Sequence, residues 1–120
     1  MKNKTLVLGA SLKTHRYSNY AMERLISNKH DVAAMGSEKG KVAGVNIATE
    51  FLQYDDIDTI TIYLNALRQK PFYDYIVSLN PKRVIFNPGT ENPEFYSVLK
   101  ENNIAFEESC TLVLLSTNQY

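Results

Sequence analysis

Five side chains that can donate hydrogen bonds or carry positive charge follow a short apolar segment near the start of the chain. The segment TLVLGAS continues as LKTHRYS, which brings together Ser11, Lys13, His15, Arg16 and Ser18. Hydroxyl and guanidinium groups bind phosphate oxygens, and an arginine can donate two parallel hydrogen bonds to one phosphate. These residues therefore indicate a phosphate-binding loop. The alternative is an ordinary turn between a strand and a helix, with solvated charges.

Two small residues precede these side chains. Gly9 allows a turn that other residues resist, and Ala10 leaves the backbone open to close approach by a ligand. Free amides at the N-terminus of the following helix would add a local positive potential. A nicotinamide dinucleotide site usually shows G-x-G-x-x-G here and an acidic residue about 20 residues later, and the chain shows neither.

The segment AMGSEKGK offers a second candidate contact with a phosphate. It carries Lys39 and Lys41 after a predicted strand. Basic residues at this place suit a ribose phosphate better than a free ribose hydroxyl. The 3′-phosphate of coenzyme A and the 2′-phosphate of NADP are the two candidates, and a solvated charged turn is the alternative.

Strands and helices alternate along the chain and must position these residues. Aliphatic and β-branched runs predict strands over 4–9, 30–36, 41–47, 58–64, 82–89 and 104–109. Apolar spacing predicts helices over 18–28, 68–80 and 92–103, a helical turn within 51–57, and a short apolar segment over 111–120. Ser18 and Asn92 are the expected N-caps, with Pro93 at the first helical position. This alternation predicts an α/β fold with a mainly parallel sheet of five or six strands and helices on both faces.

Ligands of an open α/β sheet bind outside the carboxyl ends of its strands. This rule selects the segments 9–18, 36–41, 63–65, 87–91 and 109–111. We expect these segments to lie along one edge of the sheet and to form one site.

Length, charge and cysteine content limit the classes of protein. A chain of 120 residues suits a single domain over residues 1–120. Lys plus Arg equals Asp plus Glu at 13 each, so we expect neither a nucleic-acid nor a membrane partner. The apolar run that ends at Gly9 is too short for a signal peptide or a membrane span, and a lone cysteine, Cys110, excludes an internal disulfide. These features predict a cytoplasmic location.

Taken together, the motifs resemble those of the small stand-alone coenzyme A-binding proteins, whose Rossmann-like domain also forms the N-terminal part of the succinyl-CoA synthetase alpha subunit. The resemblance covers residues 4–119 and rests on VLGAS with RYS, GSEKGKVAGV, YLN, FNPGTENPEF and EESC. It implies a three-layer Rossmann-like fold and a coenzyme A site with the diphosphate at 9–18. It also implies that Lys41 meets a phosphate and that 63–65 flank the adenine or the pantetheine arm. The phosphorylated histidine of the synthetase has no counterpart in His15 or His30.

The expected cofactor-binding residues come from these loops: Gly9, Ala10, Ser11, Arg16, Tyr17, Ser18, Gly36, Ser37, Lys39, Lys41, Tyr63, Leu64, Asn65, Pro88 and Gly89. We find no nucleophile or acid–base pair with an orienting partner, and no metal cluster at ligand spacing. Cys110 either meets the end of a pantetheine arm or is a small buried apolar residue.

We therefore expect non-catalytic binding of coenzyme A or an acyl-CoA. The alternatives are an NADP-binding protein or small reductase, and a regulatory or structural subunit with an empty nucleotide site. The segment TLVLLS, residues 111–116, packs either on a partner subunit in a homodimer or on its own sheet.

Overall fold

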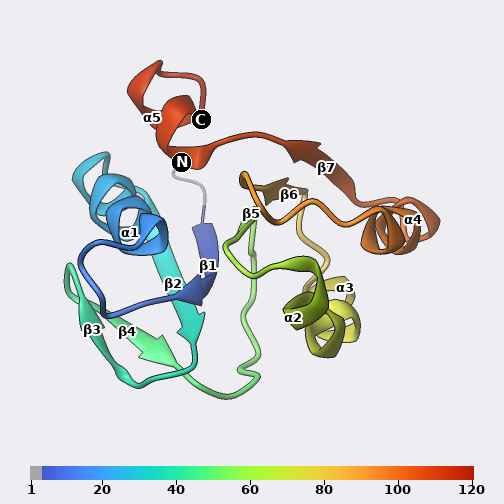
Figure 1. Cartoon of the computed structure of the whole chain (residues 1–120), viewed down its shortest axis with the longest axis horizontal. Coiled ribbons are helices and arrows are strands. Elements are labelled where there is room, and N and C mark those ends of the chain that lie inside the picture. Colours follow the sequence, from blue (N-terminus) through green and yellow to red (C-terminus); the bar gives the residue numbers. More distant parts are fainter. Residues whose placement is uncertain (1–3) are drawn as a thin grey trace.

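All the strands of the computed structural model, which describes residues 4–120, join in one seven-stranded sheet (Figure 1). They are β1 (Lys4–Ala10), β2 (Asp31–Gly36), β3 (Gly40–Val42), β4 (Val45–Ala48), β5 (Thr59–Ile62), β6 (Arg83–Phe86) and β7 (Ala105–Glu108). Their order is β3-β4-β2-β1-β5-β6-β7, and every pair is parallel except β3 with β4. The strand order reverses between β1 and β5, as it does in doubly wound α/β sheets. The expected Rossmann-like α/β fold is confirmed.

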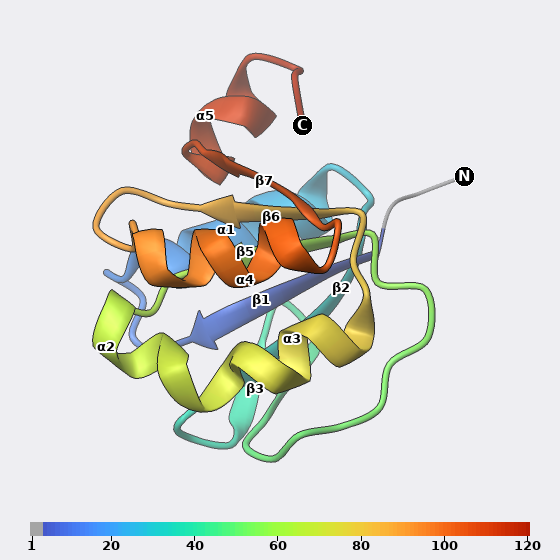
Figure 2. The same ribbon diagram turned by 90° about the vertical axis from the view of Figure 1, so that its right-hand side faces the viewer.

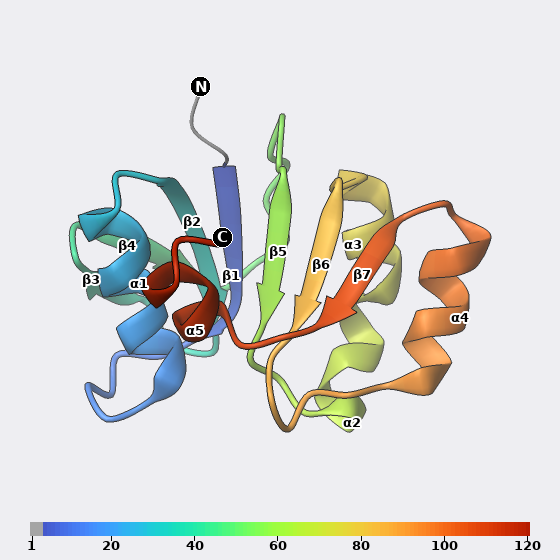
Figure 3. The same cartoon turned by 90° about the horizontal axis from the view of Figure 1, so that it is seen from above.

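Helices cover both faces of this sheet. They are α1 (Tyr17–Ser27), α2 (Ala66–Gln69), the 3-10 helix η1 (Lys70–Phe72), α3 (Tyr73–Leu79), α4 (Pro93–Glu101) and α5 (Thr111–Ser116). Figure 2 shows α3 and α4 in front of the sheet and α1 behind it, and Figure 3 shows α5 beside α1. Among residues 4–120, no helix has both the length and the apolar character needed to cross a membrane.

Successive residues of β1 supply the core on the two faces. Leu6 and Leu8 pack with buried residues of α3 and α4, whereas Val7 packs with Met22 and Leu25 of α1. This alternation follows from the two-residue period of a strand. It explains why Leu6, Val7 and Leu8 are apolar in succession, since a central strand is buried on both sides.

The predicted strand over 41–47 is instead a hairpin of β3 and β4. Ala43 and Gly44 have positive φ angles of 51° and 82°, the backbone that a tight two-residue hairpin turn requires. The sheet therefore has seven strands, whereas five or six were predicted from the sequence. The predicted helical turn within 51–57 is wrong. This segment is irregular because Asp56 has a φ of 61° and the Phe51 ring packs on Tyr75, with ring centroids 4.8 Å apart.

The helix predicted over 68–80 starts earlier and is divided. The Asn65 side chain caps α2 by accepting a hydrogen bond from the Arg68 amide, and Pro71 lies in the 3-10 turn before α3. Proline fixes its own φ and lacks an amide hydrogen, which favours such a break. The predicted start of α4 is confirmed, because Asn92 caps it and Pro93 is its first residue.

The buried Asn87 connects β6 to the strand and the helix beside it. Its Nδ2 donates to Thr61 Oγ1 at 2.7 Å and to the Ile62 carbonyl at 2.9 Å. Its Oδ1 accepts a hydrogen bond from the Thr111 amide at 2.9 Å, and this bond holds the start of α5. One side chain thus satisfies three buried polar groups, two from β5 and one from α5.

Replacing Asn87 with alanine should lower the free energy of unfolding by about 1–3 kcal/mol, because buried donors and acceptors lose their partner. Urea unfolding followed by circular dichroism measures this loss. Asn46→Ala is the matched control: Asn46 is exposed on β4, so the change should stay within about 0.5 kcal/mol. Equal losses in the two variants would contradict the role given to Asn87.

Candidate functional site

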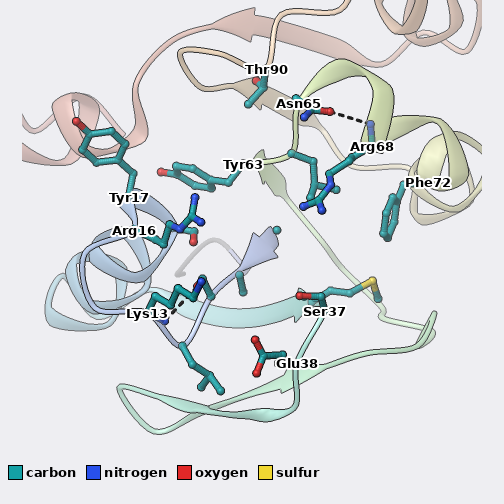
Figure 4. A pocket seen from close by; sticks show the side chains of 18 of the residues that line it. Lys13, Arg16, Tyr17, Ser37, Glu38, Tyr63, Asn65, Arg68, Phe72 and Thr90 are labelled. Atoms are coloured by element: carbon teal, nitrogen blue, oxygen red, sulfur yellow. Dashed lines mark hydrogen bonds between the residues drawn. The ribbon is translucent and has the colours of Figure 1, made fainter.

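A cleft of about 910 Å³ lies at the carboxyl ends of β1, β2 and β5 (Figure 4). The turns after these strands and after β6 form its walls, as expected from the position of sites in open α/β sheets. The structure brings most of the predicted site residues together there: Gly9, Ala10, Ser11, Arg16, Tyr17, Ser18, Gly36, Ser37, Tyr63, Leu64, Asn65, Pro88 and Gly89.

Two glycines allow the ends of three strands to approach one another. Gly9 has a φ of 93°, and the register of β1 against β2 shifts at this residue. A Cβ atom on Gly9 would lie 3.0 Å from the backbone carbon of Tyr63, and one on Gly36 would lie 2.2 Å from the carbonyl oxygen of Ala10. The two glycines therefore let the three strand ends pack more closely than any residue with a side chain would allow.

Hydrogen bonds fix the loop between β1 and α1. Ser11 Oγ accepts from the Lys13 amide at 3.1 Å, and its carbonyl accepts from Asn19 Nδ2 at 2.9 Å. The Arg16 amide donates to the Lys13 carbonyl, so a turn leads directly into the helix. For this reason Arg16, and not the predicted Ser18, is the N-cap, and it makes no side-chain capping bond.

The N-terminal turn of α1 borders the cleft. Tyr17 and Ser18 are its first two residues and both line the cleft; Ser18 is buried, whereas Tyr17 is 72% exposed. Amide groups in the first turn of a helix have no partner within the helix. Together with the helix dipole, they favour an anion at this end.

Three cationic side chains line the cleft, and none of them is neutralised by a neighbouring carboxylate. They are Lys13, Arg16 and Arg68. None of the ion pairs formed among residues 4–120 uses them. Glu38 is the only acidic residue among the described residues that line the cleft. In a chain with no net charge, this gathering of positive charge favours an anionic ligand.

The segment formed by α2 and η1 makes the wall opposite α1. Arg68, Pro71 and Phe72 line the cleft from this wall. The next residue in the helix, Gln69, is wholly buried and donates to the carbonyl groups of Leu64 at 2.8 Å and Thr90 at 2.7 Å. This buried amide fixes the wall to the loop that follows β6.

Tyr63 contributes a ring to the cleft from the end of β5. Its hydroxyl is buried near Thr61 and Thr111 and has no hydrogen-bond partner among the described residues. Burial raises the pKa of this phenol to about 12. Tyr63 is therefore neutral at physiological pH and offers the ligand an uncharged surface.

Two predicted residues lie outside the cleft. Lys39 and Lys41 are exposed and do not line it, because the segment that carries them turns into the β3–β4 hairpin, where Lys41 pairs with Asn46. Cys110 immediately precedes α5, half-buried, and also lies outside the lining. The expectation that segment 109–111 contributes to the site is therefore wrong for this cleft.

Several lining residues were not among the expected cofactor-binding residues. Leu12, Lys13, Glu38 and Thr90 lie within the predicted segments, and Lys13 belongs to the predicted phosphate-binding loop, whereas the predicted segments do not include Met35, Thr49, Arg68, Pro71 and Phe72. The sequence does hold a signal for Arg68. Asparagine is a common helix N-cap, and an N-cap at Asn65 would place Arg68 in the first turn of a helix that follows β5. Residues 4–120 contain no group of three or more His, Cys, Asp or Glu side chains placed so that they could hold a metal ion.

Solved structures share this fold over nearly the whole chain. A crystal structure of an uncharacterized protein is 47% identical, with a TM-score of 0.96, and the match covers 100% of this chain and 99% of that one. A protein from Thermus thermophilus, cell-free ID.343, is 18% identical with a TM-score of 0.87 over 99% and 91% of the two chains. A hypothetical protein from Pyrococcus horikoshii OT3 is 20% identical with a TM-score of 0.87 over 97% and 83%.

Comparison with curated proteins found no match. A family model, described as CoA binding domain, matches residues 3–116. This match extends from the first strand into α5 and includes every loop that lines the cleft. The chain therefore belongs to the CoA binding domain family.

Proposed function

We propose that the cleft binds coenzyme A or an acyl-CoA and that the protein acts as a binding module without catalysis of its own. The observation that carries this proposal is the group of three cations without carboxylate partners, which line a cleft beside the N-terminus of α1. Membership in the CoA binding domain family supports the choice of ligand. The volume of about 910 Å³ lies within the range of pockets that hold small molecules and cofactors.

The diphosphate belongs, in this proposal, at the loop between β1 and α1. The open backbone at Gly9 and Ala10 allows close approach, and the amides of the first turn of α1 donate to phosphate oxygens. Arg16 supplies charge-assisted hydrogen bonds, and the Ser11 hydroxyl can supply a further one. No imidazole or thiol occurs among the described residues that line the cleft, so a hydroxyl there has no such group to activate it.

The remaining expectations about location and partners stay predictions. The free Cys110 supports a reducing, cytoplasmic compartment, and the balanced charge supports a protein without a nucleic-acid or membrane partner. The structure supports both readings of α5. Leu115 packs on the core of its own chain, which favours a helix that belongs to its own sheet, whereas Val113 is 55% exposed, which favours a contact with a second copy in a homodimer.

Saturating coenzyme A should raise the melting temperature of the purified protein, because a ligand that binds only the folded state stabilises it by about 2.7 kcal/mol at 100 times its dissociation constant. Differential scanning fluorimetry measures the shift. Adenosine at the same concentration is the control without phosphate and should leave the melting temperature nearly unchanged. If coenzyme A, acetyl-CoA and NADP all leave the melting temperature unchanged, the proposal is wrong. The protein would then be a subunit whose nucleotide site binds none of these ligands.

The variant Arg16→Ala should bind coenzyme A about tenfold more weakly, since it loses a charge-assisted bond to phosphate. Isothermal titration calorimetry at an ionic strength of about 0.15 M, where distant charges are screened, gives the affinity. Arg24→Ala removes the same charge from the same helix but away from the cleft, and it should change the affinity by less than about twofold. Equal effects of the two substitutions would show that Arg16 affects binding only through the overall positive potential of the protein and not through a direct bond to phosphate.

A further inference from the structure

We propose that Arg68 binds the 3′-phosphate of coenzyme A and so determines the preference for coenzyme A over dephospho-coenzyme A. This inference rests on the proposed function and adds a specificity-determining residue to it. Lys39 and Lys41, which the sequence favours for this phosphate, lie outside the cleft. Of the three cations that line the cleft, Lys13 and Arg16 belong to the loop between β1 and α1, where the diphosphate is proposed, so Arg68 remains for the 3′-phosphate.

Arg68 is held in place by its neighbours on both sides. Its amide donates to Asn65 Oδ1 at 3.0 Å, which fixes the start of α2 at the end of β5. The adjacent Gln69 is wholly buried, and its Oε1 accepts a hydrogen bond from Asn92 Nδ2 at 2.9 Å. The backbone of Arg68 is thus fixed by its own bond to the Asn65 cap and by the buried bonds of the adjacent Gln69, while its side chain is exposed and lines the cleft.

The cleft presents two separate positions for anions. Figure 4 shows Arg16 below the ring of Tyr63, on the α1 side of the cleft, and Arg68 on the α2 side, and both residues line the cleft. Arg16 lies beside the helix N-terminus, where the diphosphate is proposed, and Arg68 lies on the opposite wall. Coenzyme A likewise carries two separate anionic groups, because the ribose lies between its diphosphate and its 3′-phosphate.

The wall around Arg68 also suits the adenosine that carries this phosphate. Phe72 follows four residues after Arg68, and both line the cleft together with Pro71. An aromatic side chain next to a cation is a combination that accepts a base and a phosphate. The turn after β2 offers no such cation, since its lining residues are Gly36, Ser37 and Glu38. A phosphate placed against Glu38 would be repelled.

The test measures the affinities of the full chain for coenzyme A and for dephospho-coenzyme A by isothermal titration calorimetry. In the wild-type protein, coenzyme A should bind about tenfold more tightly than dephospho-coenzyme A. Arg68→Gln should reduce this preference to less than about twofold, with the affinity for dephospho-coenzyme A nearly unchanged. Arg68→Lys, which keeps the charge, should retain part of the preference.

Lys41→Gln is the matched control, because it removes a positive charge that lies outside the cleft. It should leave the preference at the wild-type value. A full preference in Arg68→Gln, or one that disappears in Lys41→Gln, would overturn the inference. So would a wild-type protein that binds the two ligands equally, although the proposed function would then stand. If the wild-type protein binds neither ligand, the proposed function itself fails.

Discussion

The cleft depends on the close approach of backbones at the carboxyl ends of β1, β2 and β5. At Gly36 a side chain would collide with the carbonyl oxygen of Ala10, because its Cβ would lie only 2.2 Å away. At Gly9 the positive φ bends the end of β1 towards the backbone of Tyr63. Without these two contacts the strand ends would have to separate, and the loops that carry the cleft residues would lose their common base.

Buried amide side chains then hold the loops around this base. Asn87 fixes the end of β6 to β5 and to the start of α5, and Gln69 fixes α2 to the loop after β6. Each of these side chains has a partner that is distant in sequence: Thr90 for Gln69, and Ile62 and Thr111 for Asn87. Because the loops are fixed by such bonds, exposed residues on them keep defined positions. Arg68 is the clearest case, since a flexible cation is attached to a rigid wall.

Much of the fold could be predicted from local patterns. Residues that are neighbours in the sequence predict the apolar strands, the capped start of α4 and the tight turn at the end of β1. The hairpin of β3 and β4 was missed because it depends on Ala43 taking a positive φ, which alanine rarely does. The sequence placed Lys39 and Lys41 in the site because they follow β2, whereas the hairpin carries them away from it. Arg68 was missed because the predicted helix began at residue 68, so Asn65 was not recognised as an N-cap, and because the position of α2 also depends on the tertiary bond of Gln69 to Thr90.

The most direct test of the central claim is a titration of the isotope-labelled protein with coenzyme A, followed by the backbone amide signals in NMR spectra. The account predicts that the largest shifts occur in the loops after β1, β2, β5 and β6, with the amides of 9–18 and Arg68 among them. The β3–β4 hairpin turn at Ala43 and Gly44 should change little. Shifts confined to the groove between α1 and α5, or no shifts at saturating coenzyme A, would contradict the claim that this cleft is the binding site.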